Sequence, residues 1–242
     1  YNDIYAALNA SKSLPAGVGT VIVKHANPCG VSINKNKVSS FKEALTSDPI
    51  SAFGGIVSCN FKINTKLAVE LSKTYFEVVI GNSYEKDAIR ILKKRKNLRI
   101  IDSSKIKLEN INCIVSNFNS LLIQSPDNKK FESKNFQVVS KKKPSSKIFR
   151  ELMFALNVCR YVKSNAIVLT SNTRTVGIGS GQPSRLDSCK IAIDKMKNFQ
   201  KIKENDEIVA ASDAFFPFVD GIETLIQAGV SAVIQPSGSI RD

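Results

Sequence analysis

The sequence predicts an α/β protein built as two layered α/β/α lobes. Short apolar runs rich in Val and Ile alternate along the chain with segments of helical periodicity, which is typical of layered α/β architecture. A pattern of strand, polar turn, glycine-bearing strand and helix occurs twice, over residues 20–58 and 163–199. With 242 residues and 43% hydrophobic content, the chain can bury a core in each lobe.

The first lobe is expected over residues 1–125. Thr65 is a predicted N-cap because it directly precedes a periodic segment. Residues 102–146 are polar, and their short strands are the least regular part of the pattern. We predict helices over 2–14, 41–46, 65–74 and 84–96, and strands over 20–24, 54–61, 76–80, 98–101, 113–115, 120–124 and 136–139.

A linker is expected over residues 126–146, and a second lobe over 147–242. The segment Pro144-Ser145-Ser146 caps a predicted helix that runs to residue 161. We then predict strands over 165–170, 175–179, 207–212 and 231–235, and helices over 184–199 and 220–228.

Charge and cysteine content narrow the class of protein. The formal net charge is +14, but the basic clusters at 93–96 and 141–143 have no adjacent aromatic residues. We therefore interpret them as a solvated lysine-rich surface that attracts anionic small molecules, and consider nucleic-acid binding the less favoured interpretation. The five cysteines are widely spaced, which fits reduced thiols and a cytoplasmic protein. No apolar run is long enough to span a membrane, and no signal peptide opens the chain, which begins with Tyr1 and is expected to be part of a longer protein.

The sole histidine, His25, lies in the stretch VIVKHANPCG. It follows a β-branched run that predicts a buried strand, and Asn27-Pro28 with Gly30 predicts a turn directly after it. An imidazole at a strand end is a typical position for a proton acceptor in an α/β protein. The alternative is a histidine that only bonds the backbone of its neighbours.

Two further segments are candidates for binding. In GIGSGQPSR (177–185) three glycines and Arg185 precede a helix, which suits an anion, although the spacing is not that of a dinucleotide-binding motif. In SDAFFPF (212–218) phenylalanines flank Pro217 and could form a wall for a flat heterocycle. The alternatives are a structural turn for the first segment, and core packing with a helix-capping Asp220 for the second.

A zinc site is not expected, because the sequence lacks a complete set of zinc ligands. HANPC resembles part of the deaminase pattern H-x-E…P-C-x-x-C. Position 27 is Asn where that pattern has Glu, and no second cysteine follows at the required spacing. We expect no metal.

Five motifs together resemble a known enzyme family. They are KHANPCGV (24–31), DPISAFGGIV (48–57), VKSNAIVL (162–169), GIGSGQPSRLDSCKIA (177–192) and ASDAFFPFVDGI (211–222). The chain is similar over nearly its whole length to the transformylase part of the bifunctional purine-biosynthesis enzymes. These combine aminoimidazole-carboxamide ribonucleotide formyltransferase with inosine monophosphate cyclohydrolase. The family's lobes resemble the cytidine deaminase fold without zinc.

The resemblance implies formyl transfer from 10-formyltetrahydrofolate to the exocyclic amine of the ribonucleotide. It implies a cytoplasmic homodimer with nucleotide and folate as small-molecule partners. Catalytic roles would fall to Lys24, His25, Asn165 and Asp220. Substrate contacts would come from Asn27, Phe53, Glu77, Ser184, Arg185, Phe215, Phe216 and Pro217.

The chain also departs from the family pattern. The cyclohydrolase domain, the RYGENPHQ-type start and the Arg-x-Phe segment of the family's C-terminal end are missing. The competing hypotheses are therefore a basic nucleic-acid-binding module and an inactive fragment of the transformylase.

Overall fold

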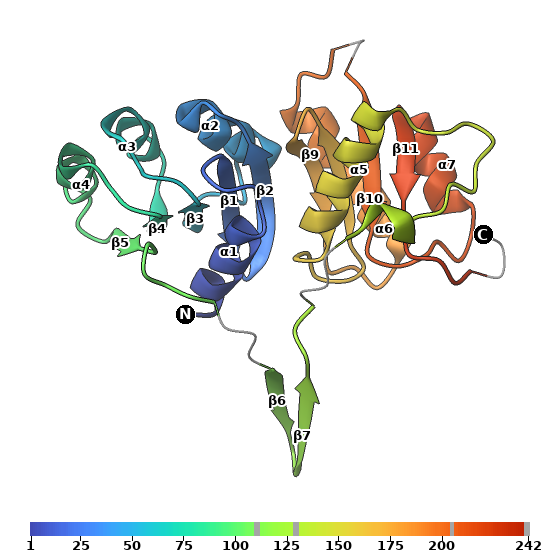
Figure 1. Cartoon of the computed structure of the whole chain (residues 1–242), viewed down its shortest axis with the longest axis horizontal. Helices are drawn as coiled ribbons and strands as arrows, with labels where there is room; N and C mark the ends of the chain where they lie inside the picture. Colours follow the sequence, from blue (N-terminus) through green and yellow to red (C-terminus); the bar gives the residue numbers. More distant parts are fainter. Residues whose placement is uncertain (109–111, 128–130, 204–205, 240–242) are drawn as a thin grey trace. The chain divides into compact units, whose positions relative to one another are not determined.

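The computed structural model describes residues 1–108, 112–127, 131–203 and 206–239. The chain divides into two compact units (Figure 1). The larger contains Tyr1–Ser104 and Pro144–Asp242, and the smaller spans Lys105–Lys143.

The larger unit consists of two halves with the same order of elements. Each half starts with a helix, continues with a β-hairpin and then alternates helices with strands. The first half contains α1 (Asn2–Lys12), β1 (Gly19–Lys24), β2 (Asn27–Ile33), α2 (Lys37–Ser47), β3 (Gly55–Cys59), α3 (Thr65–Leu71), β4 (Phe76–Gly81), α4 (Lys86–Leu92) and β5 (Arg99–Asp102). The second contains α5 (Ser146–Cys159), β8 (Ile167–Ser171), β9 (Arg174–Gly179), α6 (Arg185–Phe199), β10 (Ile208–Ser212), α7 (Asp220–Gln227) and β11 (Val230–Ile234).

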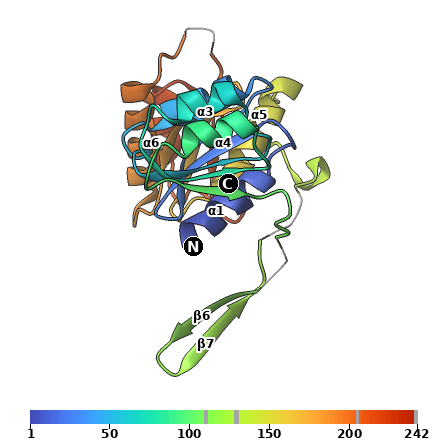
Figure 2. The same ribbon diagram turned by 90° about the vertical axis from the view of Figure 1, so that its left-hand side faces the viewer.

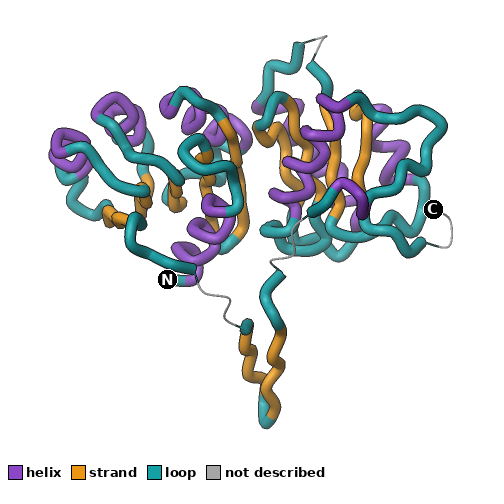
Figure 3. Tube along the Cα trace, viewed as in Figure 1, coloured by secondary structure: helices purple, strands orange, loops and turns teal. Residues whose placement is uncertain are grey.

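One nine-stranded sheet runs through both halves, in the order β11-β10-β8-β9-β2-β1-β3-β4-β5. Figure 3 shows strands (orange) alternating with helices (purple) in both halves. In each half the first strand of the hairpin pairs antiparallel with the next strand along the chain, and the strands after that pair in parallel. The order β2-β1-β3-β4 in the first half therefore corresponds to β9-β8-β10-β11 in the second. This confirms the internal repeat and the α/β class predicted from the sequence.

Helices cover both faces of the sheet (Figure 2). On one face α2, α3 and α4 enclose a core with the sheet of the first half, and α6 and α7 do so in the second. On the other face α1 meets α5, where Asn157 Nδ2 donates to Ser13 Oγ at 3.0 Å. The layered arrangement therefore continues across the β2–β9 pair that joins the halves.

Helix and strand approach each other closely at two glycines that correspond in the repeat. A Cβ on Gly30 in β2 would lie 1.9 Å from the carbonyl oxygen of Ala44 in α2. A Cβ on Gly177 in β9 would lie 2.0 Å from the carbonyl oxygen of Ala192 in α6. Only glycine permits these contacts.

The smaller unit is a two-stranded hairpin of β6 (Cys113–Asn117) and β7 (Ser120–Gln124) with the 3₁₀ turn Ser133–Asn135. Every residue of both strands is exposed. The strands at 113–115 and 120–124 are confirmed, whereas 136–139 is not a strand, because no described segment pairs with it.

Two other local predictions need correction. Thr65 is the first helical residue rather than the cap, because Asn64 Oδ1 accepts from Leu67 N and Thr65 instead donates to Glu85. The helix predicted over 84–96 spans only Lys86–Leu92. Tyr84 lies before it, and its hydroxyl donates to the carbonyls of Val79 and Ile101.

The lobe boundaries predicted at 125 and 147 and the likeness to the cytidine deaminases stay predictions. No helix in the described parts of the chain is long and apolar enough to cross a bilayer.

Candidate functional site

The topology brings the ends of several strands to one edge of the sheet. The end of β1 and the start of β2 lie there, since these strands form a hairpin. The ends of β9 and β10 flank the start of β8, because Ile167 pairs with both Gly179 and Ser212. The antiparallel β2–β9 pair places both halves' contributions on this same edge, which we call the site edge.

His25 lies in the two-residue turn of the β1–β2 hairpin. His25 and Ala26 both have positive φ, of 51° and 60°, which is the backbone of a tight type I′ hairpin turn. The turn predicted at 27–30 is therefore wrong: it lies two residues earlier, and Asn27–Ile33 is a strand. In the described residues the His25 imidazole is exposed and makes no hydrogen bond, so it is accessible to a ligand.

Lys24 is held by backbone carbonyls. Its Nζ donates to Phe53 O at 3.1 Å and to Gly54 O at 2.9 Å. A Cβ on Gly54, which has a φ of 69°, would lie 2.9 Å from this nitrogen. An ammonium group has three N–H donors, so one remains for a ligand.

Asn27 joins the hairpin to the second half of the site edge. Its Oδ1 accepts from Lys163 N at 2.9 Å, and its Nδ2 donates to His25 O at 3.3 Å. Lys163 lies two residues before Asn165 in sequence. The hairpin turn and the segment that leads into β8 are therefore fixed to one another.

Asn165, Arg185 and Asp213 form a hydrogen-bonded cluster at this edge. Arg185 Nη2 donates to Asn165 Oδ1 at 2.7 Å, and its Nη1 donates to Asp213 Oδ1 at 2.5 Å. Asn165 Nδ2 in turn donates to the carbonyls of Gln182 and Pro183, at 2.8 and 3.0 Å. The cluster thus binds the glycine-rich loop to the start of β8 and the end of β10.

Asp213 is a member of this cluster that the sequence-based site lacks. Burial opposes its charge, but hydrogen bonds from Ser164 and Arg185 and from Ala166 N outweigh burial and hold its pKa below the usual range. The signal available in the sequence is a carboxylate directly after a buried strand, in front of the phenylalanines.

The phenylalanine segment is divided between core and surface. Phe216 is buried, and its ring centroid lies 5.9 Å from the Arg185 guanidinium carbon. Its backbone N–H donates to Gln235 Oε1 at 2.9 Å. Phe215 and Pro217 are exposed, so the core-packing alternative holds for Phe216 only.

The remaining candidates lie at element ends. Ser184 is the N-cap of α6, and its Oγ accepts from Asp187 N. Asp220 is exposed at the start of α7, where its Oδ1 accepts from Gly221 N at 2.8 Å and Val219 is the N-cap. Glu77 is exposed near the start of β4, which pairs in parallel with β3 and so begins at the site edge.

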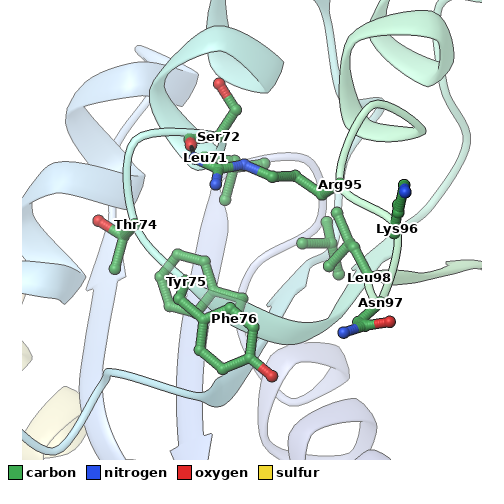
Figure 4. Close-up of a pocket in the computed structure, with 10 residues that line it drawn as sticks. Leu71, Ser72, Thr74, Tyr75, Phe76, Arg95, Lys96, Asn97 and Leu98 are labelled. Atoms are coloured by element: carbon green, nitrogen blue, oxygen red, sulfur yellow. Dashed lines mark hydrogen bonds between the residues drawn. The ribbon is translucent and has the colours of Figure 1, made fainter.

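Two exposed aromatic rings lie next to the carbonyls that hold Lys24: Phe53 supplies one of these carbonyls, and Tyr75 directly precedes β4. The centroids of the Phe53 and Tyr75 rings are 5.3 Å apart, at an interplanar angle of 47°. Tyr75 also lines a largely apolar pocket of about 190 Å³ next to it (Figure 4). The lining residues are Leu71, Ser72, Thr74, Tyr75, Phe76, Val79, Arg95, Lys96, Asn97 and Leu98. The site edge therefore carries an aromatic surface beside a concavity.

The structure offers no assembled ligand set for a metal in the parts of the chain that it describes. No three His, Cys, Asp or Glu side chains are grouped there. Cys29, the cysteine nearest His25 in sequence, is buried and its Sγ donates to Ile22 O. Burial raises the pKa of this thiol to about 12, so it stays protonated. The absence of a catalytic zinc stays a prediction.

The comparisons with known proteins agree on one family. The model of the AICARFT/IMPCHase bienzyme family matches residues 1–195. The chain is 41% identical over 227 residues to the bifunctional purine biosynthesis protein PurH of Prochlorococcus marinus (strain MIT 9515), covering 93% of this chain and 43% of that protein. It is 40% identical over 242 residues to PurH of Aquifex aeolicus (strain VF5), covering 100% of this chain and 47% of that protein. The chain thus spans less than half the length of either relative.

Proposed function

The chain belongs to the AICARFT/IMPCHase bienzyme family, and on that premise we propose that its site edge catalyses formyl transfer. The donor is 10-formyltetrahydrofolate, and the acceptor is the exocyclic amine of aminoimidazole-carboxamide ribonucleotide. The observation that carries the proposal is that the exposed imidazole of His25 follows directly in sequence on Lys24, whose ammonium is held by two backbone carbonyls.

The reaction needs a proton acceptor because the amine is conjugated to an electron-poor ring and is a weak nucleophile. The amine nitrogen attacks the formyl carbon and passes its proton to the neutral His25 imidazole. The bond from the formyl carbon to N10 of the folate then breaks, and N10 takes up a proton. The remaining N–H donor of Lys24 stabilises the oxyanion that develops on the formyl group.

The hydrogen-bonded cluster supplies the substrate contacts in this proposal. Both N–H groups of Asn165 are already bonded to carbonyls, and its Oδ1 accepts from Arg185, so the second lone pair of Oδ1 accepts from the carboxamide of the substrate. Arg185 uses three N–H groups within the protein, which leaves two for the nucleotide. The net charge of +14 favours approach of the anionic substrate.

The exposed rings supply a surface for the folate. Phe53 and Tyr75 present flat faces beside the carbonyls that hold Lys24, and a pteridine ring stacks on such faces. Glu77 lies on the same edge, where its carboxylate accepts hydrogen bonds from the pteridine N–H groups.

The proposal is tested by incubating this chain with both substrates and measuring the formation of tetrahydrofolate. We expect turnover that is lost in His25→Asn and Lys24→Met, with nucleotide binding retained in calorimetry. A chain that binds neither the nucleotide nor the folate would contradict the proposal. Tight binding to oligonucleotides that weakens steeply with salt would instead support the nucleic-acid-binding module.

A further inference from the structure

A largely buried ion pair joins the two halves. Lys195 Nζ, on α6, donates to Asp48 Oδ2 at 2.8 Å, and the side chains are 28% and 3% exposed. Asp48 directly follows the last residue of α2. A carboxylate is disfavoured at the negative end of a helix dipole, so its charge there depends on its partners.

Asp48 also organises the loop that follows it. Its Oδ1 accepts from Ser51 N at 2.9 Å, and its Oδ2 accepts from Ser51 Oγ at 2.7 Å. The backbone then turns back on itself, with Ala52 N donating to Asp48 O at 3.1 Å. These bonds fix residues 48–52 as a compact turn around one carboxylate.

The same loop ends in the carbonyls that hold Lys24. Phe53 O and Gly54 O accept from Lys24 Nζ, and Gly54 N donates to Tyr75 O at 2.8 Å. A continuous series of hydrogen bonds and one short loop therefore connects the Lys195 ammonium to the Lys24 ammonium. The connection begins on the helix whose first residue is Arg185.

We propose that Asp48 and Lys195 are positioning residues for Lys24. Through the 48–54 loop they set the place of the two carbonyls, and so the direction of the third Lys24 donor. The link also couples the helix that starts at Arg185 to the Lys24–His25 end of the site. This inference rests on the proposed function for its catalytic consequence, but the positioning of Lys24 can be measured without turnover.

The first experiment measures the reactivity of Lys24 in the folded chain. A limiting dose of an N-hydroxysuccinimide acetate ester is applied, and acetylation at Lys24 is compared with that at exposed Lys86 by peptide mass spectrometry. We expect Lys195→Met to raise the Lys24-to-Lys86 ratio at least threefold, because the amine is released from its carbonyls. Lys195→Arg, which keeps the charge and the donor, should bring the ratio back toward that of the wild type.

Lys190→Met is the matched control, since it makes the same change on the same helix. The Lys190 side chain is 57% exposed, and its Nζ lies 3.9 Å from Asp187 Oδ1. Its replacement should therefore leave the Lys24-to-Lys86 acetylation ratio unchanged. Equal Lys24 acetylation in Lys195→Met and Lys190→Met would overturn the inference. If Lys195→Met does not fold, the double variant Asp48→Asn with Lys195→Met removes both charges and answers the same question.

Kinetics separate this inference from the proposed function. In the active chain, Lys195→Met should lower kcat about tenfold while the KM for the nucleotide changes less than threefold. If the wild-type chain shows no formyl transfer, the proposed function is contradicted, but the acetylation result still tests the positioning of Lys24. If Lys195→Met changes neither kcat nor the acetylation of Lys24, the inference is contradicted and the proposed function is not affected.

Discussion

The guanidinium of Arg185 bonds Asp213 and Asn165 at the same time, at 2.5 and 2.7 Å. Arg185 and Asp213 have side chains only 11% and 16% exposed. Removing one partner of such a shielded ion pair is strongly destabilising, because the remaining charge has neither its partner nor much contact with solvent. The conformation of Asn165 therefore depends on a carboxylate 48 residues away in sequence.

Replacing Asp213 with Asn should destabilise the protein. The variant loses a charge-assisted acceptor for Arg185, and an amide N–H then faces donors. We expect the free energy of unfolding in urea to fall by about 2–3 kcal/mol. Glu207→Gln, which breaks the exposed pair with Lys147, is the control and should cost about 0.5 kcal/mol or less. Equal effects of the two variants would contradict the assigned importance of the cluster.

The acid stability of the chain should depend on Asp213 and Asp48. Hydrogen bonds and cationic partners outweigh burial and lower both carboxyl pKa values below 3.8 in the folded state. At a pH between the folded and unfolded pKa values, the unfolded state binds more protons than the folded state. The contribution of these carboxylates to the free energy of unfolding is therefore complete above the unfolded pKa and is lost as the pH falls through the folded pKa. Urea unfolding between pH 5 and pH 2.5 should therefore show a shallower decline in Asp213→Asn than in the wild type. A steeper decline in the variant would contradict the pKa directions.

Loss of the His25 imidazole should affect turnover far more than folding. His25→Asn should lower kcat roughly a hundredfold or more, since the proton acceptor is gone. Asn tolerates the positive φ at this position better than Ala, so comparing His25→Asn with His25→Ala separates chemistry from backbone strain. Unchanged turnover in His25→Asn would exclude a proton-transfer role.

The close helix–strand approach should make two glycines irreplaceable. In Gly30→Ala and Gly177→Ala the new methyl group would overlap a helix carbonyl, so we expect a cost of about 3 kcal/mol or more. Gly229→Ala is the control, because its φ is 91° but no atom lies within 4 Å of the added Cβ. Its cost should stay at about 1–2 kcal/mol. Thermal unfolding of the three variants makes the comparison.

Zinc should not copurify in stoichiometric amounts. The Cys29 thiol is protonated and donates to Ile22 O, so it is not available as a thiolate beside His25. Elemental analysis after dialysis should give well below one zinc per chain. One tightly held zinc that EDTA removes only with loss of structure would contradict this expectation.

The fold was largely predictable because local signals and tertiary structure agree in most of the strands. Runs such as 165–170 and 207–212 are β-branched or small, and they occupy buried central strands. The hairpin turn was not predictable, since His25 and Ala26 are not typical turn residues. Asn27, Pro28 and Gly30 are stronger local turn formers, but Gly30 is required for contact with α2.

The structure places Lys24, Asn165 and Arg185, which the sequence motifs single out, on one edge of the sheet, and their role as site residues stays a prediction. Their contacts with one another are not evident from the sequence. The sequence pattern does not mark Asp213 as a site residue, because its partners Arg185 and Ala166 are 28 and 47 residues away in sequence. Such distant pairing depends on strand register, which the residue pattern alone does not determine.

The duplicated architecture has a consequence for how the molecule can be assembled. Each half encloses its own hydrophobic core, and the halves continue one sheet through β2 and β9. Residues 105–143, which connect them along the chain, form a unit of their own. The protein is thus a natural candidate for a split reporter: separately expressed polypeptides 1–104 and 144–242 would complement one another by completing a shared sheet.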